Sequence, residues 1–331
     1  MSSRAFATAL ALALAALLVA CGSGPAAQTP GPAVSTNSEA HVFVEPDDGP
    51  EPLLGELNSA SKSIDLTMYL LTDRPVIAAL ESAKRRGVQV RTLLEEHPFG
   101  GGQGNQSAYA RLQRGGVAVR WTGPRFKLTH EKAAVVDGRE ALILTLNLTA
   151  SAFSRNREYG AVDRTPEDVT EAASLFNADW NRTAYVPSRP DLVVSPDNSR
   201  GKLLTLIRQA TRQLDMESEE VRDSGLEQAL IDAARRGVDV RVVLSPAQSG
   251  PDANAQGVQR LQAGGVHAHS MRKPYVHAKI FVADGQTAFL GSENISSQSL
   301  DGNRELGLFL SQPAAVARME STFEQDWNAR S

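Results

Sequence analysis

Cysteine is almost absent from this 331-residue sequence, in which Cys21 stands alone. No intramolecular disulfide can form, and a cysteine-rich zinc site is excluded. The sequence also lacks a His-Glu-x-x-His motif and any cluster of carboxylates, so we expect no metal requirement and no cofactor. Neither sign of charge predominates, because the sequence has 34 Lys and Arg residues and 38 Asp and Glu residues, which gives a formal charge of −4. That balance argues against a protein that coats nucleic acid through bulk charge.

A hydrophobic run long enough to span a bilayer is also missing at the amino terminus. The apolar run 5–20 follows Arg4 and has 16 residues, fewer than the ~20 of a membrane-spanning helix. This layout is typical of a secretory signal. The run ends in Leu18-Val19-Ala20-Cys21-Gly22, which resembles a bacterial lipobox, although an ordinary signal followed by an incidental Cys is the alternative.

The lipobox resemblance implies a lipoprotein signal peptide at 1–20 and a lipid attached to Cys21. The following residues, 21–40, are rich in Gly, Ser, Pro and Ala, which predicts a flexible tether. We therefore expect an exported protein that is lipid-anchored to a bacterial membrane, on its periplasmic or outer surface.

The remainder of the chain contains two copies of one unit. Residues 85–91, with the sequence Arg-Arg-Gly-Val-Gln-Val-Arg, recur almost unchanged at 235–241. At one common offset of 147, seven further residues recur, namely His130, Lys132, Asp137, Asn147, Asn156, Glu158 and Trp180 as His277, Lys279, Asp284, Asn294, Asn303, Glu305 and Trp327. Chance repetition in a fixed register is negligible. A repeat this long indicates duplication of a whole domain, with units at 41–182 and 191–331 and a linker at 183–190.

Strand and helix patterns alternate within each unit. In the first unit we predict helices at 53–61, 75–86, 107–114 and 166–180, and strands at 41–45, 63–69, 88–94 and 117–121. Two further apolar runs, 131–136 and 140–145, are joined by Asp137-Gly138, a strong hairpin signal. The pattern predicts an α/β fold with a mixed sheet covered on both faces.

The second unit carries a complete motif. His277-Ala278-Lys279 is followed by Asp284 and then by Gly291-Ser292-Glu293-Asn294. This resembles the phospholipase D superfamily signature, His-x-Lys-x4-Asp-x6-Gly-Ser-x-Asn, and Asn303-Arg304-Glu305 fits the family's downstream Glu. The first unit repeats the pattern from His130 to Glu158 but has Leu144-Thr145 in place of Gly-Ser. There Thr145 preserves the hydroxyl.

The resemblance implies two tandem phospholipase D-like domains, each a mixed β-sheet flanked by helices. It also implies pseudo-twofold symmetry and one active site between the domains. In the family's usual assignment His130 is the nucleophile and His277 the general acid, although the residues alone leave this order open. A neutral imidazole attacks an anionic phosphodiester without charge repulsion, and a protonated one donates to the leaving alcohol. An ordinary pKa near 6.5 suits histidine to both tasks.

The neighbouring polar residues fit supporting tasks. On a strand, residues two apart face the same side, so Lys132 and Lys279 would reach the phosphate oxygens beside each histidine. The amides of Asn147 and Asn294 suit the same task. As acceptors for an imidazole N–H or as other supporting groups, we single out Glu158, Glu305, Thr145, Ser292, Asp137 and Asp284. The two aspartates are each followed by Gly, so a turn role is the competing interpretation for them.

The substrate has to be argued separately from the fold. The predicted tether, the negative net charge and the duplication favour a phospholipid, cleaved on its headgroup side to give phosphatidic acid. A cardiolipin synthase is less expected, since the membrane-spanning amino-terminal helices of that branch are not found. A metal-independent endonuclease remains the alternative, because basic segments at 125–127 and 272–275 precede the two histidines. We expect the two segments to meet at one cleft and attract an anion, and a solvated loop is the competing interpretation. A binding protein without activity is disfavoured by the complete double motif, and the duplication predicts a functional monomer.

Overall fold

The first unit forms one mixed sheet. The computed structural model describes residues 39–98 and 104–329, so the predicted signal, Cys21 and all but the end of the tether lie outside the described residues. The sheet order is β1 (Ala40–Glu45), β7 (Asn156–Asp163), β6 (Glu140–Leu144), β5 (Lys132–Val136), β2 (Ser63–Met68), β3 (Gln89–Leu94) and β4 (Ala118–Trp121). Strands β2, β3 and β4 run parallel, and the remaining pairs along this order are antiparallel.

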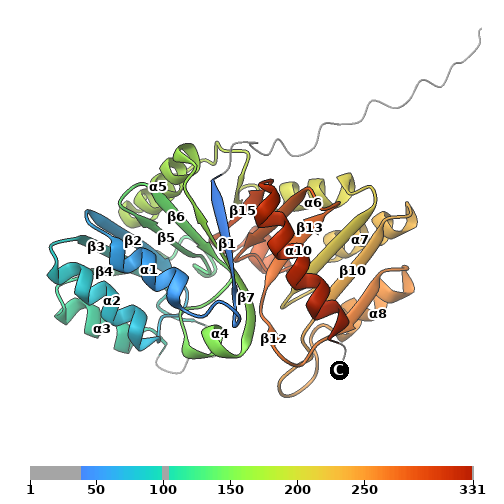
Figure 1. The fold of residues 1–331 in the computed structure, drawn as a ribbon, viewed down its shortest axis with the longest axis horizontal. Helices are drawn as coiled ribbons and strands as arrows, with labels where there is room; N and C mark the ends of the chain where they lie inside the picture. The colour runs from blue at the N-terminus through green and yellow to red at the C-terminus, as the bar shows by residue number, and fades with distance from the viewer. Residues whose placement is uncertain (1–38, 99–103, 330–331) are drawn as a thin grey trace, which may run out of the picture. The chain divides into compact units, whose positions relative to one another are not determined.

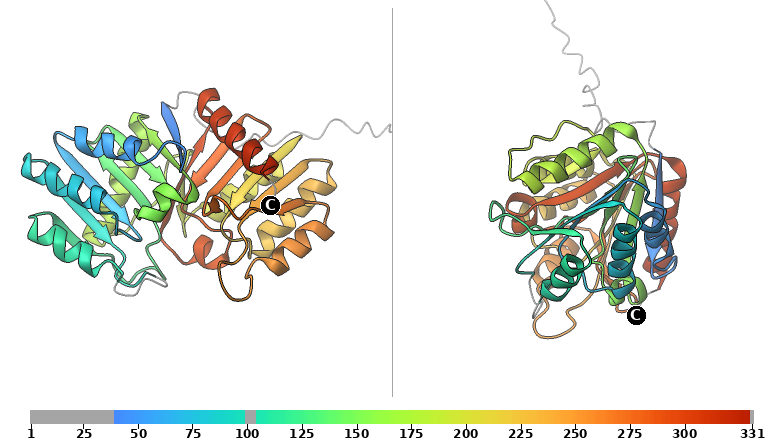
Figure 2. Two further views of the ribbon diagram at one scale, coloured as in Figure 1. Left: turned by 60° about the horizontal axis from the view of Figure 1, so that its bottom comes forward. Right: turned by 90° about the vertical axis from the view of Figure 1, so that its left-hand side faces the viewer.

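The second unit repeats this plan. Its sheet order is β11 (His267–Ser270), β10 (Asp239–Leu244), β9 (Gln213–Ser218), β13 (Lys279–Ala283), β14 (Thr287–Gly291), β15 (Glu305–Leu310) and β8 (Leu192–Ser195). Figures 1 and 2 show the two sheets and the helices around them. The predicted fold class, two tandem domains that each contain a mixed sheet flanked by helices, is confirmed.

Helices cover the outer face of each sheet. Over the first sheet lie α1 (Glu51–Ser59), α2 (Arg74–Arg85) and α3 (Gln106–Arg114), and over the second lie α6 (Ser199–Gln209), α7 (Ser224–Arg235) and α8 (Ala255–Ala263). Each unit closes with a longer helix, α5 (Pro166–Asn181) or α10 (Pro313–Asn328). The short helices are α4 (Ala150–Ser154) and α9 (Ser297–Asp301).

Local sequence signals account for these elements. The side chain of Asp73 caps α2 by accepting from the backbone N–H of Val76, and Gly87 follows the helix with φ +94°. Between β5 and β6, Asp137 and Gly138 have φ values of +55° and +64°, as a two-residue hairpin turn requires. The predicted hairpin is therefore confirmed, whereas β7 and α4 were not predicted.

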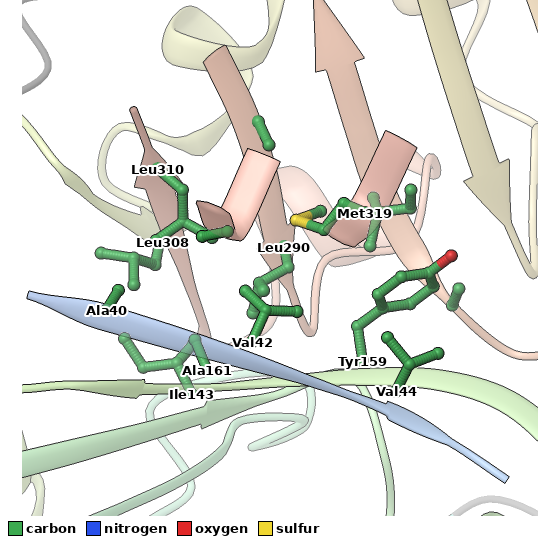
Figure 3. Close-up of a cluster of buried hydrophobic side chains, with 14 of the residues drawn as sticks. Ala40, Val42, Val44, Ile143, Tyr159, Ala161, Leu290, Leu308, Leu310 and Met319 are labelled. Carbon is green, nitrogen blue, oxygen red and sulfur yellow. The ribbon is translucent and has the colours of Figure 1, made fainter. Parts of the chain in front are cut away.

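A shared hydrophobic core covers the inner face of both sheets. It joins Val42 and Tyr159 of the first unit to Leu290, Leu308 and Met319 of the second (Figure 3). Helices α5 and α10 pack against the same core. The prediction that both sheet faces are covered is correct, and the inner cover is largely the other unit. No helix in the described parts of the chain is long and apolar enough to cross a membrane.

The segment just before each histidine forms backbone hydrogen bonds with the other unit. The strand β12 (Tyr275–Val276) of the second unit pairs in parallel with Asn156 and Arg157 at the start of β7. In the mirrored position, the backbone N–H of Arg304 donates to the carbonyl of Leu128 at 2.9 Å. These crossings place each histidine beside the strand that carries the other unit's glutamate.

Candidate active site

His130 is held by the second unit. Its backbone N–H donates to the carbonyl of Arg304 at 2.8 Å, and its Nδ1 lies 2.8 Å from the carboxylate of Glu305. The ring is nearly buried and meets the Tyr69 ring edge-on, with 4.5 Å between the ring centres. Because Glu305 engages Nδ1, the other ring nitrogen, Nε2, is the one placed to react.

His277 has the mirrored arrangement. Its backbone N–H donates to the carbonyl of Arg157 at 3.2 Å, and its Nδ1 lies 2.7 Å from Oε1 of Glu158. Each glutamate therefore serves the histidine of the other unit. Sequence spacing predicted that these glutamates accept from an imidazole, but it could not show the exchange between units.

The two lysines are buried beside their histidines. Lys132 Nζ donates to the carbonyl of His130 at 2.6 Å, and Lys279 Nζ donates to the carbonyl of His277 at 2.5 Å. Burial lowers the pKa of Lys132 to about 7, and the charge of Lys279 adds to the shift. Besides burial, the charge of Lys279 lowers the pKa of both His130 and Lys132, so the four predicted residues from the two units lie close together.

Burial also affects His130. It lowers the pKa of His130, and the opposing negative charge of Glu305 offsets this only in part. A buried imidazole of lowered pKa is neutral near pH 7, which suits a nucleophile.

The amides of Asn147 and Asn294 have unsatisfied groups, and Asn147 lies on the wall of the pocket beside His277. In both residues Oδ1 is buried and has no hydrogen-bond partner within the described chain. An unpaired buried polar atom costs about 1–3 kcal/mol. A bound ligand that pairs with these amides would remove that cost, which is consistent with their predicted task.

The hydroxyl group that donates to the glutamate comes from different positions in the two units. Thr145 donates to Oε2 of Glu158 at 2.7 Å, as a supporting residue would. In contrast Ser292 accepts from the backbone N–H of Leu306 at 3.1 Å, and Ser299 donates to Glu305 at 2.6 Å. No repeat signal pointed to Ser299, because the corresponding residue at the 147-residue offset is an alanine.

The two aspartates lie away from the histidines, at the opposite ends of strands β5 and β13. The Asp137 carboxylate accepts from the backbone N–H groups of residues 61–63, at 2.6–3.1 Å. Asp284 binds the backbone of residues 211–213 in the same way. Although burial opposes it, these hydrogen bonds hold the pKa of both carboxyls below the ordinary range. The structure favours the turn interpretation of these two residues.

A polar pocket of about 1100 Å³ opens beside His277. Its lining includes Asn147, Glu219, Tyr275, Arg272 and Lys273. The basic segment 272–275 therefore lines the site. The corresponding segment 125–127 does not join it, which corrects the expectation of two basic segments meeting at one cleft.

The packing of Phe126 keeps segment 125–127 away from this pocket. Its ring stacks under the guanidinium of Arg304, 4.2 Å from the ring centre, and Arg125 donates to the carbonyl of Thr183. These contacts turn the segment toward a separate pocket of about 230 Å³.

Sequence reasoning also missed Glu219. Its Oε2 lies 2.8 Å from Lys279 Nζ and 3.3 Å from His277 Nε2. Burial alone would raise the pKa of Glu219, but the charges of His277 and Lys279 outweigh burial and hold it far below the ordinary range. In the described residues, no group of three His, Cys, Asp or Glu side chains is arranged to hold a metal ion.

Residues 53–180 and 203–327 each match the family described as "Cardiolipin synthase, PLD-like domain". The "Phospholipase D Z" of Dictyostelium discoideum is 38% identical over 109 residues, which cover 30% of this chain and 25% of that protein. The "Cardiolipin synthase" of Listeria innocua is 22% identical over 343 residues, which cover 89% of this chain and 70% of that protein. The similarity thus extends to the branch that we expected less.

Two solved structures share the fold. Polyphosphate kinase from Porphyromonas gingivalis has a TM-score of 0.69 at 17% identity, covering 87% of this chain and 50% of that chain. Phosphatidylserine synthase from Haemophilus influenzae has a TM-score of 0.67 at 12% identity, covering 88% of this chain and 85% of that chain. At such identities the likeness is one of fold alone.

Proposed function

Because the chain belongs to the family described as "Cardiolipin synthase, PLD-like domain", we propose that this phospholipase D-type phosphodiesterase transfers the phosphatidyl group of a phospholipid to an alcohol or to water. The observation that carries the proposal is the pair of crossed histidine–glutamate contacts, 2.8 Å for His130 and 2.7 Å for His277, with a buried lysine beside each. Two imidazoles held at Nδ1 leave Nε2 of each ring to act on one phosphodiester, although Nε2 of His277 also lies 3.3 Å from Oε2 of Glu219.

In the first step, Nε2 of neutral His130 attacks phosphorus. A P–N bond forms, and the P–O bond to the headgroup breaks. The departing oxygen takes a proton from His277, so the headgroup leaves as a neutral alcohol. Lys132 and Lys279 stabilise the negative charge that builds on the non-bridging oxygens.

In the second step, an alcohol or a water molecule attacks phosphorus. His277, now neutral, accepts the proton from the attacking hydroxyl, and the P–N bond to His130 breaks. Water gives phosphatidic acid, and an alcohol gives a new phosphodiester. Both outcomes use the same residues, so the accepting hydroxyl decides between hydrolysis and transfer.

The experiment supplies the full chain with mixed phospholipid vesicles and ethanol in the presence of EDTA, and follows phosphatidylethanol by mass spectrometry. The product is expected with the parent chain and lost with His130→Ala and with His277→Ala. Production by the parent alone supports a covalent phosphatidyl intermediate. If the parent forms the product without EDTA but not with EDTA, the expectation of no metal requirement is contradicted.

A nuclease is the second candidate, supported by Arg155, Arg272 and Lys273 around the pocket. Cleavage of single-stranded DNA or RNA without any lipid product would select it. Nucleic-acid cleavage should fall steeply as salt increases, because binding releases counterions. Hydrolysis in vesicles should follow binding to the interface instead.

The proposed location is a membrane surface, with Cys21 as the lipid-bearing residue and the following segment as a tether. Cys21→Ser is expected to move the protein from the membrane fraction to the soluble fraction, measured by fractionation and immunoblotting. Retention of the variant in the membrane fraction would contradict a lipid anchor at this position.

A further inference from the structure

The two halves of the site carry different residues at one equivalent position. Tyr69 follows β2 and Glu219 follows β9, at the 150-residue offset that relates these strands. The Tyr69 ring lies beside His130, and its centre is 5.0 Å from Lys132 Nζ. The half of the site around His277 has a carboxylate at this position.

Glu219 contacts two hydrogen-bond donors that could bind a phosphate. Its Oε2 contacts both Lys279 Nζ, at 2.8 Å, and His277 Nε2, at 3.3 Å. Its side chain is 24% exposed, on the wall of the 1100 Å³ pocket. A phosphate that reaches these two donors therefore meets a fixed negative charge.

Lys132 differs in this respect. Its Nζ donates to the carbonyl of His130, and no carboxylate of the described residues forms a salt bridge with it. The site thus offers Lys132, which is a cation below its pKa of about 7 and has no acidic contact, and Lys279, which Glu219 already pairs. This distribution of charge matches a ligand that carries a single negative charge.

We propose that Glu219 determines the charge of the phosphate that this site accepts, favouring a singly charged phosphodiester over a doubly charged phosphomonoester. The inference rests on the proposed function, since it concerns the same site. A diester carries one negative charge, whereas a monoester carries two above its second pKa of about 6. Repulsion at close range grows with that second charge. Phosphatidic acid, the product of hydrolysis, would be released for the same reason.

The test measures binding rather than turnover. Dibutyl phosphate and butyl phosphate are titrated into the full chain by calorimetry at pH 5 and pH 8, and the ratio of the two dissociation constants is compared. In the parent the diester should be preferred at pH 8. The preference should shrink at pH 5, where the monoester is also singly charged. Because Lys132 gains its charge over the same range, the contribution of Glu219 is measured by comparing the parent with its variants at one pH.

Glu219→Gln is expected to tighten butyl phosphate about tenfold or more at pH 8 and to change dibutyl phosphate much less. Glu219→Tyr, which copies the first unit, should act in the same direction and provides a second fold-competent variant. Glu220→Gln is the matched control, because Glu220 pairs with Arg222 at 2.5 Å. That variant should match the parent.

An unchanged ratio in both Glu219 variants, or equal tightening of both ligands, would overturn the inference. Either result is independent of the lipid assay. If the ratio changes as expected while no phosphatidylethanol forms, the charge selection stands and the phospholipid substrate fails. If phosphatidylethanol forms and the ratio does not change, the function stands and the role of Glu219 fails.

Discussion

At the scale of single residues, the site depends on carboxylates that reach across the two units. Glu305 and Glu158 each hold Nδ1 of a histidine that belongs to the other unit. Such a contact fixes the imidazole tautomer and stabilises its protonated form. Glu305 is itself bound by Ser299 and Asn303, and Glu158 by Thr145 and Asn156, so both carboxylates are held in place.

We predict that Glu305→Gln and Glu158→Gln each lower kcat about 100-fold or more. A neutral amide cannot balance the positive charge that His130 gains when the P–N bond forms, or the charge that His277 carries before it donates its proton. Steady-state kinetics on vesicles provide the measurement. Asp137→Asn is the control, since it also replaces a buried acid but lies at the β5–β6 turn. Its kcat should stay within about twofold of the parent. A comparable loss in the control would show that general destabilisation explains the effect.

The pH dependence follows from buried groups of the first unit. His130 must be neutral to attack, and burial lowers its pKa, so activity should rise at a pH below the ordinary 6.5. Lys132 must be protonated to bind phosphate, and its pKa of about 7 means that this charge is lost as pH increases through neutrality. Together they predict a bell-shaped profile of kcat/KM against pH.

Lys132→Arg separates two causes of the loss of activity at alkaline pH, which are deprotonation of the lysine and deprotonation of the imidazole that acts as general acid. Guanidinium remains charged across this range, so only the imidazole that protonates the leaving group still limits activity there. The fall above neutrality should therefore become shallower in the variant than in the parent. A rate that rises continuously from pH 5 to pH 9 would contradict two imidazoles in opposite protonation states.

At the scale of elements, strands β7 and β15 do two tasks. An arginine stands before each glutamate, Arg157 within β7 and Arg304 directly before β15, and each forms a buried ion pair with the other unit. Arg304 binds Asp179 of α5 at 2.9 Å, and Arg157 binds Asp326 of α10 at 2.5 Å. The arginines therefore fix each strand against the closing helix of the partner unit.

Breaking such a pair leaves a buried charge unpaired, which typically costs about 3–5 kcal/mol. We predict that Arg304→Met lowers the free energy of unfolding by about this amount, measured by urea denaturation. Arg318→Met is the matched control, because Arg318 pairs across the same two units with Asp48 but both side chains are 35% exposed. Its loss should stay below about 1 kcal/mol. Equal losses in the two variants would contradict a special contribution of the buried pair.

At the scale of the whole molecule, one chain brings together both histidines and both glutamates of the candidate site. The two sheets share a single hydrophobic core, and both histidines depend on contacts with the opposite unit. Duplication within one chain thus does what two copies of a single unit would do in a symmetric dimer.

The prediction at this scale concerns mixed variants. His130→Ala and His277→Ala chains are each expected to be inactive, and a mixture of the two should recover no activity, because neither chain can lend its intact half to the other. The assay is phosphatidylethanol formation, with analytical ultracentrifugation of the parent alongside. Recovered activity in the mixture would show that sites are shared between chains.

Much of the architecture follows directly from the sequence. The 147-residue register, the Asp137-Gly138 turn and the helix that ends at Gly87 depend on local preferences, so they predict the duplicated α/β fold. The His-x-Lys pairs are also local, because residues two apart on an extended chain face one side. Strand β7 was missed, and with it the element that carries Glu158.

Only the tertiary structure decided which groups meet. The exchange of Glu158 and Glu305 between units follows from the pairing of residues 275–276 with β7, a contact between segments more than 100 residues apart. Glu219 has no repeated signal, since its equivalent is Tyr69, and its importance lies in two distances to Lys279 and His277. Sequence fixes local conformation, whereas such contacts depend on how two complete sheets pack, which no local preference encodes.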